Sequence, residues 1–112
     1  MPRMTRMVRR VALAGVVAAA LAGATARADD AGPVAAGKAV AQTWCVNCHV
    51  VTAEQTQGSD QAPTWTSIAN RPGTTPDSLH GFLAQPHGKM PDFKLSKTDI
   101  DNVVAYILSL KT

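Results

Sequence analysis

The chain has 112 residues, enough for one domain, and its formal net charge of +3 comes from its first quarter. Beyond residue 28, six lysines and arginines stand against eight aspartates and glutamates, a formal charge of −2, so the basic balance is no sign of nucleic-acid binding. Aromatic residues make up only 4% of the chain, and a domain of this size buries a small core unless a cofactor or cross-link adds to it.

An export signal occupies the N-terminus. Residues 1–10 contain several arginines, and they are followed by an uncharged apolar run and by Ala26-Arg27-Ala28, a small-x-small cleavage site. This order is typical of a secretory signal peptide. We predict a signal peptide over 1–28, cleaved after Ala28, and a single periplasmic domain over 29–112. The apolar run is short for a bilayer, and an uncleaved membrane anchor is the alternative.

The first half of the predicted domain contains two helices and a polar loop. Gly32-Pro33 starts a helix that runs to Trp44, because proline suits the first helical turn. Residues 50–62 are polar and predict a loop. A short helix over 66–70 follows, and Arg71-Pro72-Gly73 closes it as a turn.

The second half predicts two further helices. Thr75 is placed as N-cap of the third helix, with Pro76 at its first position, and its buried stripe is expected to consist of Leu79, Phe82 and Leu83. The last helix is predicted over about 97–110, where apolar residues recur at i, i+3, i+4 and i+7. Ser96-x-x-Asp99 resembles a capping box before it, with Asp in place of the usual Glu or Gln. No segment alternates as a strand would.

The motif Cys45-Val46-Asn47-Cys48-His49 predicts covalent attachment of haem c. Two thiols at this spacing can each add across a vinyl group of one porphyrin, and the adjacent His49 can then bind the iron. Three other interpretations compete. A disulfide would close a very small loop, a thioredoxin-like pair would need a βαβ setting, and a zinc site would need ligands at spacings that the other histidines do not have.

Met90 is the candidate for the second axial position of the iron. It is the one methionine after the predicted signal peptide, and it lies on a loop between Pro86 and Pro91, about forty residues after His49. A thioether suits low-spin haem iron and raises its reduction potential. The alternatives are Met90 as a core filler, and His87 or, less favourably, His80 as the ligand.

The chain resembles the class I c-type cytochromes in their small single-haem bacterial form. The resemblance covers essentially the whole mature chain and depends on the following features: Gly37, the C-x-x-C-H motif, Ala62-Pro63, Arg71, the Met90-Pro91 loop and Tyr106. It implies an all-α cytochrome c fold, with three main helices plus a short helix around one haem that two thioethers attach.

The resemblance also implies roles for single residues. Gly37 on the first helix would pack against Tyr106 on the last. The carbonyl of Pro63 would accept the N–H of the proximal histidine, which fixes the orientation of that ring. Arg71 would lie near a haem propionate. Trp65 is a departure, because a smaller aliphatic residue is common there; it is placed at the haem edge or on a propionate.

The function implied is one-electron transfer in a periplasmic redox chain. With both axial positions filled, we expect no enzyme activity. The expected partners are redox proteins, a donor and an acceptor that dock transiently, so a membrane is contacted only through membrane-bound redox partners. The chain is expected to be a monomer. Two alternatives stay open: a haem subunit of a larger oxidoreductase, or a five-coordinate haem protein that binds a gas or reduces peroxide.

Overall fold

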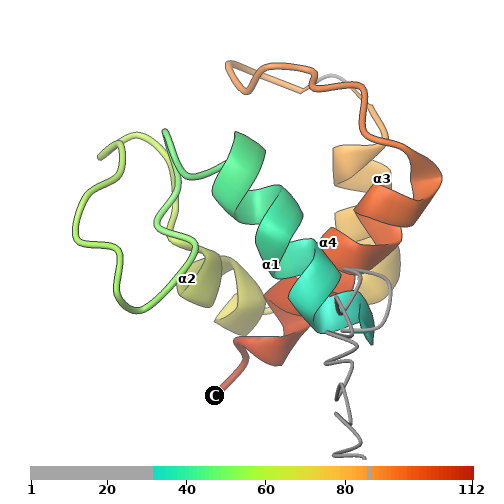
Figure 1. The fold of residues 1–112 in the computed structure, drawn as a ribbon, viewed down its shortest axis with the longest axis horizontal. Helices are drawn as coiled ribbons and strands as arrows, with labels where there is room; N and C mark the ends of the chain where they lie inside the picture. Colours follow the sequence, from blue (N-terminus) through green and yellow to red (C-terminus); the bar gives the residue numbers. More distant parts are fainter. Residues whose placement is uncertain (1–31, 86) are drawn as a thin grey trace, which may run out of the picture.

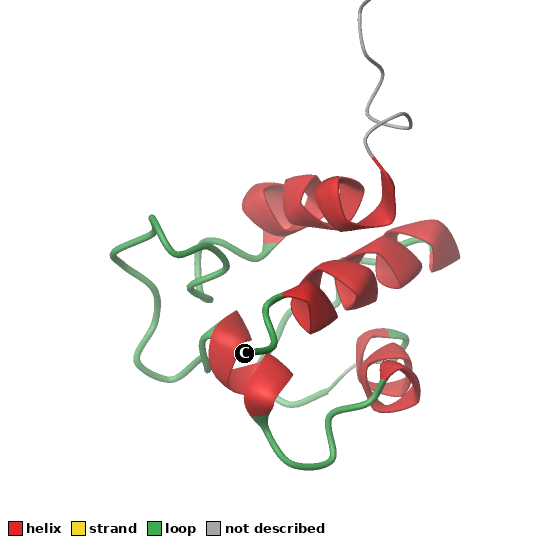
Figure 2. Cartoon of the chain, turned by 90° about the horizontal axis from the view of Figure 1, so that it is seen from below, coloured by secondary structure: helices red, strands yellow, loops and turns green. Residues whose placement is uncertain are grey.

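The chain is all-α. The computed structural model describes residues 32–85 and 87–112, so the predicted signal peptide and residues 29–31 lie outside the described part. The helices within it are α1 (Gly32–Trp44), α2 (Trp65–Asn70), α3 (Pro76–Leu83) and α4 (Lys97–Ser109). Three longer helices and one short helix, without a strand in the described ranges, confirm the predicted fold class (Figures 1 and 2). No helix in these ranges is long and apolar enough to cross a membrane.

Local capping explains where the helices begin. The Thr75 hydroxyl accepts a hydrogen bond from the backbone N–H of Ser78 at 3.1 Å, as predicted, and Ser78 reciprocates by accepting the Thr75 N–H. Ser96 and Asp99 form the same reciprocal pair at the start of α4, so aspartate does replace the usual glutamate. Thr64 caps α2, and this cap starts the helix one residue earlier than predicted.

α1 and α4 pack directly on each other, and they cross in Figure 1. Gly37 lies at their closest approach. A Cβ atom at this position would clash with the carbonyl oxygen of Asn102 and would come within 2.9 Å of the Tyr106 Cβ. The expected pairing of Gly37 with Tyr106 is therefore confirmed, and the backbone of α4 is the tighter restraint.

The buried core is small and gathers around α4. Its buried residues on α4 are Ile100, Val103, Val104, Tyr106 and Ile107, and Ala41, Ala69 and Leu79 of the other helices pack with them. The prediction that Phe82 is buried with Leu79 is wrong, because 54% of Phe82 is exposed. Its ring lies instead against His87, with 3.5 Å between the ring centroids, at a cavity described below.

Gly37→Ala is expected to lower the free energy of unfolding by about 2 kcal/mol, because a backbone carbonyl cannot rotate away from the added methyl group. Gly81→Ala is the matched control: it lies in α3 with nothing within 4 Å of the added Cβ, and alanine should stabilise the helix by about 0.5–1 kcal/mol. Denaturant unfolding followed by far-UV circular dichroism measures both. Equal effects of the two substitutions would contradict the proposed helix contact.

Candidate haem site

The C-x-x-C-H segment continues directly from the end of α1. The Cys45 N–H donates to the Ala41 carbonyl at 2.8 Å, and the His49 N–H donates to the Cys45 carbonyl at 2.9 Å, so helical turns place both cysteines and the histidine. Cys48 is exposed, whereas Cys45 is buried. Burial raises the pKa of the Cys45 thiol to about 11, and the neighbouring Cys48 adds to the rise.

The ring of His49 is fixed by a backbone carbonyl. Its Nδ1 lies 2.6 Å from the carbonyl oxygen of Pro63, the contact that the resemblance implied. A carbonyl oxygen can only accept, so Nδ1 bears the hydrogen and donates it. The lone pair of Nε2 is consequently available to a metal.

The two residues after His49 are held by distant parts of the chain. The Val50 carbonyl accepts the backbone N–H of Trp65 at 3.0 Å, and the Val51 carbonyl accepts the buried hydroxyl of Tyr106 at 2.6 Å. The Trp65 ring packs near two other rings. Its centroid is 6.2 Å from that of His49 and 5.7 Å from that of Tyr106. Burial raises the pKa of Tyr106, and the charge of Glu54 contributes to the rise, so the hydroxyl stays a donor at neutral pH.

Gln55 holds the loop that follows the haem motif, a role that the sequence analysis did not predict. Its Nε2 lies 3.0 Å from the Val46 carbonyl, 2.7 Å from the His49 carbonyl and 2.7 Å from the Gln57 carbonyl. Its Oε1 accepts the Val51 N–H at 2.9 Å. An amide nitrogen has two hydrogens, so one of them is shared between two acceptors. One side chain thus ties together both ends of the 46–57 loop.

A cavity of about 860 Å³ opens beside these residues. The C-terminal end of α1, the haem motif, α2, α3 and the 87–93 loop all contribute to its wall. Every residue that the sequence singled out for the haem or its iron lines this cavity: Cys45, Cys48, His49, Pro63, Trp65, Arg71 and Met90. His87 lines it as well. His80 does not, and its Nε2 lies 3.3 Å from a carboxylate oxygen of Asp101 on α4.

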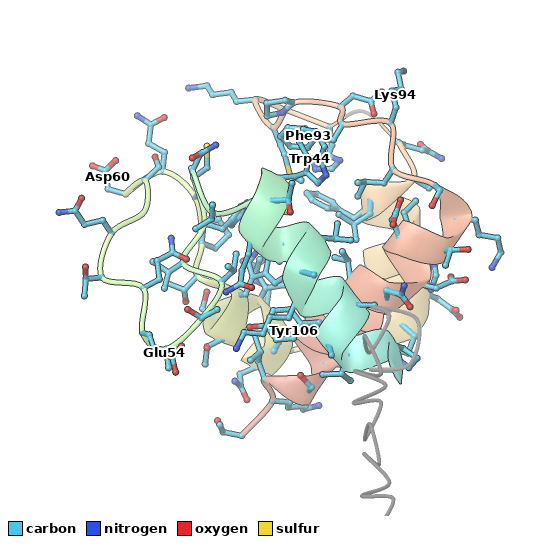
Figure 3. All side chains as sticks on the ribbon, viewed as in Figure 1. Trp44, Glu54, Asp60, Phe93, Lys94 and Tyr106 are labelled. Carbon is cyan, nitrogen blue, oxygen red and sulfur yellow. The ribbon has the colours of Figure 1, made fainter. Side chains whose placement is uncertain are left out.

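Large apolar side chains are exposed at the cavity. Trp44, Phe82 and Phe93 all line it, and 51%, 54% and 36% of their surfaces are exposed. Trp44 and Phe93 contact each other, with 5.9 Å between ring centroids, although they come from α1 and from the Met90 loop (Figure 3). A flat apolar group in the cavity would cover these rings. The cavity size, its aromatic wall and the ligand set of two thiols, an imidazole and a thioether therefore fit haem.

The comparisons with known proteins agree with this geometry. A protein family described as cytochrome c oxidase, cbb3-type, subunit III, matches residues 32–107. Cytochrome c-552 of Bradyrhizobium diazoefficiens is 42% identical over 96 residues, which cover 86% of this chain and 89% of that protein. The chain belongs to the cytochrome c family. No solved structure matches this cytochrome significantly.

Membership of the family, with two cysteines at C-x-x-C spacing, makes the chain an electron carrier with covalently bound haem. The cytochrome therefore exchanges electrons with redox partners. Two sets of contacts were missed from the sequence: the Gln55 network behind the haem motif and the Trp44–Phe93 pair at the cavity. Glutamine in a polar loop and an aromatic residue at a helix end are both common, and nothing in their spacing indicates the distant groups that they meet.

Gln55→Met is expected to destabilise the loop after the haem motif, because methionine keeps the length of the side chain but has neither amide donors nor a strong acceptor. The half-buried carbonyls of Val46 and His49 and the Val51 N–H would lose their partner, at a cost of about 2 kcal/mol in the free energy of unfolding. Amide hydrogen exchange should show lost protection at Val51.

Gln57→Met is the control, because the Gln57 side chain is exposed and makes no hydrogen bond within the described residues. It should leave both the stability and the exchange at Val51 unchanged. If Gln55→Met behaved like this control, Gln55 would be an ordinary surface residue of the loop.

Proposed function

We propose that this cytochrome is a one-electron carrier whose haem iron is bound by His49 and Met90. One observation supports this most directly. His49, whose Nε2 lone pair is available, and the thioether of Met90 line one cavity together with the two cysteines. When bound, haem supplies the one-electron couple of its iron. The polypeptide sets the axial ligands, the burial and the hydrogen bonds that tune that couple.

The two thiols attach the cofactor. Each S–H adds across one vinyl C=C bond, so the sulfur bonds to one carbon and the hydrogen goes to the other. Cys45 lies one helical turn before His49, and Cys48 is its direct neighbour in the sequence. Attachment of the porphyrin to both cysteines would therefore bring the imidazole to the iron. The Pro63 carbonyl keeps the ring oriented through Nδ1, and this bond also increases the basicity of Nε2.

Met90 supplies a soft thioether ligand, which raises the reduction potential relative to a second histidine. Arg71 and Trp65 are proposed to meet the haem propionates. Arg71 is exposed at the cavity and forms no ion pair within the described ranges, so its guanidinium is available to a carboxylate. Trp65 is buried in the cavity wall, and its indole N–H is the polar group it can offer.

Two protein ligands on the iron leave no coordination position for a substrate, so we infer a carrier and not an enzyme. The predicted signal peptide over 1–28, with cleavage after Ala28, supports a periplasmic location of the domain over 29–112, which we propose to be a monomer. Its donor and acceptor would be redox proteins that dock transiently.

A second candidate function is supported by the description of the matching family. That description names a subunit of cytochrome c oxidase, so a haem subunit of a larger oxidoreductase is the alternative. The relative that matches most of this chain is named a cytochrome and not an oxidase subunit, which favours a free carrier. Fractionation distinguishes the two: a free carrier is recovered in a periplasmic extract, and a subunit is recovered with membranes and co-purifies with its oxidase.

The ferric cytochrome is expected to show the weak red absorption band of sulfur-to-iron charge transfer, and Met90→Ala is expected to abolish it. The reduction potential should fall in the variant because the thioether is lost. Absorption spectra of the haem-loaded protein and potentiometric titration test this. A wild-type ferric protein that is high-spin, or a ferrous form that readily binds carbon monoxide, would instead indicate an open axial position and a five-coordinate haem protein.

Trp44→Ala is expected to loosen the loop that holds Met90, since the contact with Phe93 joins this loop to α1. An aromatic pair contributes about 0.5–1.5 kcal/mol beyond its buried area, so imidazole added from solution should displace Met90 with an about two- to tenfold lower apparent Kd. Titration of the ferric protein with imidazole measures this. Trp44→Phe should preserve much of the contact, and Val34→Ala, an exposed site elsewhere on α1, should have no effect.

A further inference from the structure

We propose that His87 is a reserve ligand of the haem iron, which binds through Nε2 when Met90 does not hold the iron. This inference rests on the proposed ligation by Met90. It differs from the alternative in which His87 is the resident ligand, because here the two side chains take the same axial position in turn.

The geometry of the loop brings the two donor atoms together. His87 and Met90 form an isolated antiparallel bridge across a tight turn in which Gly88 has a φ of 52°, a conformation that glycine adopts readily. The Nε2 atom of His87 lies 3.1 Å from the Sδ atom of Met90. Both residues line the cavity that fits haem. A change of side-chain rotamer therefore suffices to exchange one donor for the other.

The protonation pattern of His87 leaves its metal-binding atom available. Its Nδ1 lies 2.7 Å from the carbonyl oxygen of Gln85, which can only accept a hydrogen bond. In the neutral imidazole the hydrogen is therefore on Nδ1, and Nε2 presents a lone pair toward a sulfur atom that is itself an electron-pair donor. Two lone-pair donors that face one region without a hydrogen between them are arranged for a shared cation.

The position of the ring is restrained from a second side. Phe82 of α3 lies against His87 with 3.5 Å between the ring centroids, so the imidazole is packed at the cavity and not free in solvent. This contact also explains why the Phe82 side chain faces the cavity and is not buried among the helices. Restraint by Gln85 and Phe82 keeps Nε2 directed at the Met90 sulfur, which reduces the entropy that His87 would lose on binding.

The other nitrogen ligands of the chain are less well placed. His80 lies outside the cavity and contacts Asp101. The Nζ of Lys94 is 2.7 Å from a carboxylate oxygen of Asp92, an ion pair that raises the pKa of the lysine and keeps its amine protonated. Lys89 lines the cavity, but no hydrogen bond or ion pair within the described residues holds its amine beside the Met90 sulfur.

The experiment compares haem-loaded wild type, the single variants Met90→Ala and His87→Ala, and the double variants Met90→Ala/His87→Ala and Met90→Ala/His80→Ala. Absorption and electron paramagnetic resonance spectra are recorded at neutral pH. We expect Met90→Ala to lose the red charge-transfer band and yet remain low-spin and six-coordinate, with the g values of bis-histidine haem. Adding His87→Ala should convert it to a high-spin form that binds carbon monoxide when reduced. Adding His80→Ala should change nothing.

Each other outcome overturns the inference. A high-spin Met90→Ala protein means that His87 does not reach the iron. A low-spin spectrum that persists without His87 means that another group is the reserve ligand. If wild type lacks the charge-transfer band and His87→Ala alone makes it high-spin, His87 is the resident ligand, and the proposed ligation by Met90 fails together with this inference. Loss of the band in Met90→Ala with a high-spin product removes the reserve ligand alone.

Discussion

The close packing of α1 on α4 at Gly37 is the contact on which the geometry of the haem site depends. α1 ends at Trp44, directly before the first cysteine of the motif, and α4 presents Tyr106 toward the segment after His49. Because a glycine at the crossing lets the two backbones approach, the Tyr106 hydroxyl reaches the Val51 carbonyl at 2.6 Å. The helix crossing thereby restrains the haem motif from both of its ends, and Trp65 fills the space between Tyr106 and His49.

The polypeptide forms only part of its own hydrophobic core. The buried apolar residues gather around α4, while Trp44, Phe82 and Phe93 are left exposed around a cavity of about 860 Å³. Exposed aromatic rings in a small domain are costly in water, at about 25 cal/mol for each Å² of apolar surface that stays uncovered. The haem that this cytochrome attaches covalently is large, flat and largely apolar, so it would cover these exposed rings. We therefore expect the stability of the fold to depend on the bound haem.

Local features of the fold could be predicted from the sequence. The capping residues Thr75 and Ser96 begin their helices through hydrogen bonds to residues three positions later. The C-x-x-C-H motif, which is continuous in the sequence, indicates covalent haem attachment by itself. The contact between His49 and Pro63 was reached through the family resemblance and is present at 2.6 Å.

The features that were missed depend on how loops and helices fold back on one another. The role of Gln55 requires the loop to fold back so that the Val46 and His49 carbonyls face one amide. The exposure of Phe82 requires a cavity beside α3, since its spacing on the helix by itself indicates the buried face. The Trp44–Phe93 contact joins residues 49 positions apart, and no local pattern relates them.

The two sides of the haem cavity are restrained very differently. His49 is held by Pro63, and the residues around it are held by Gln55, Trp65 and Tyr106, which come from several elements.

By contrast, within the part of the chain that the structure describes, the hydrogen bonds and ion pairs of residues 87–95 stay within that loop or reach Gln85. Aromatic contacts with α1 and α3 join the loop to the rest of the domain. In the proposed ligation, the hydrogen bonds around His49 hold the imidazole in one orientation, which favours electron transfer because little has to move at the iron. A loop held by packing instead of a hydrogen-bond network is the element in which a ligand can change without unfolding the domain. The proposed exchange of ligands is thus confined to the loop of Met90, where the Nε2 atom of His87 lies beside the sulfur.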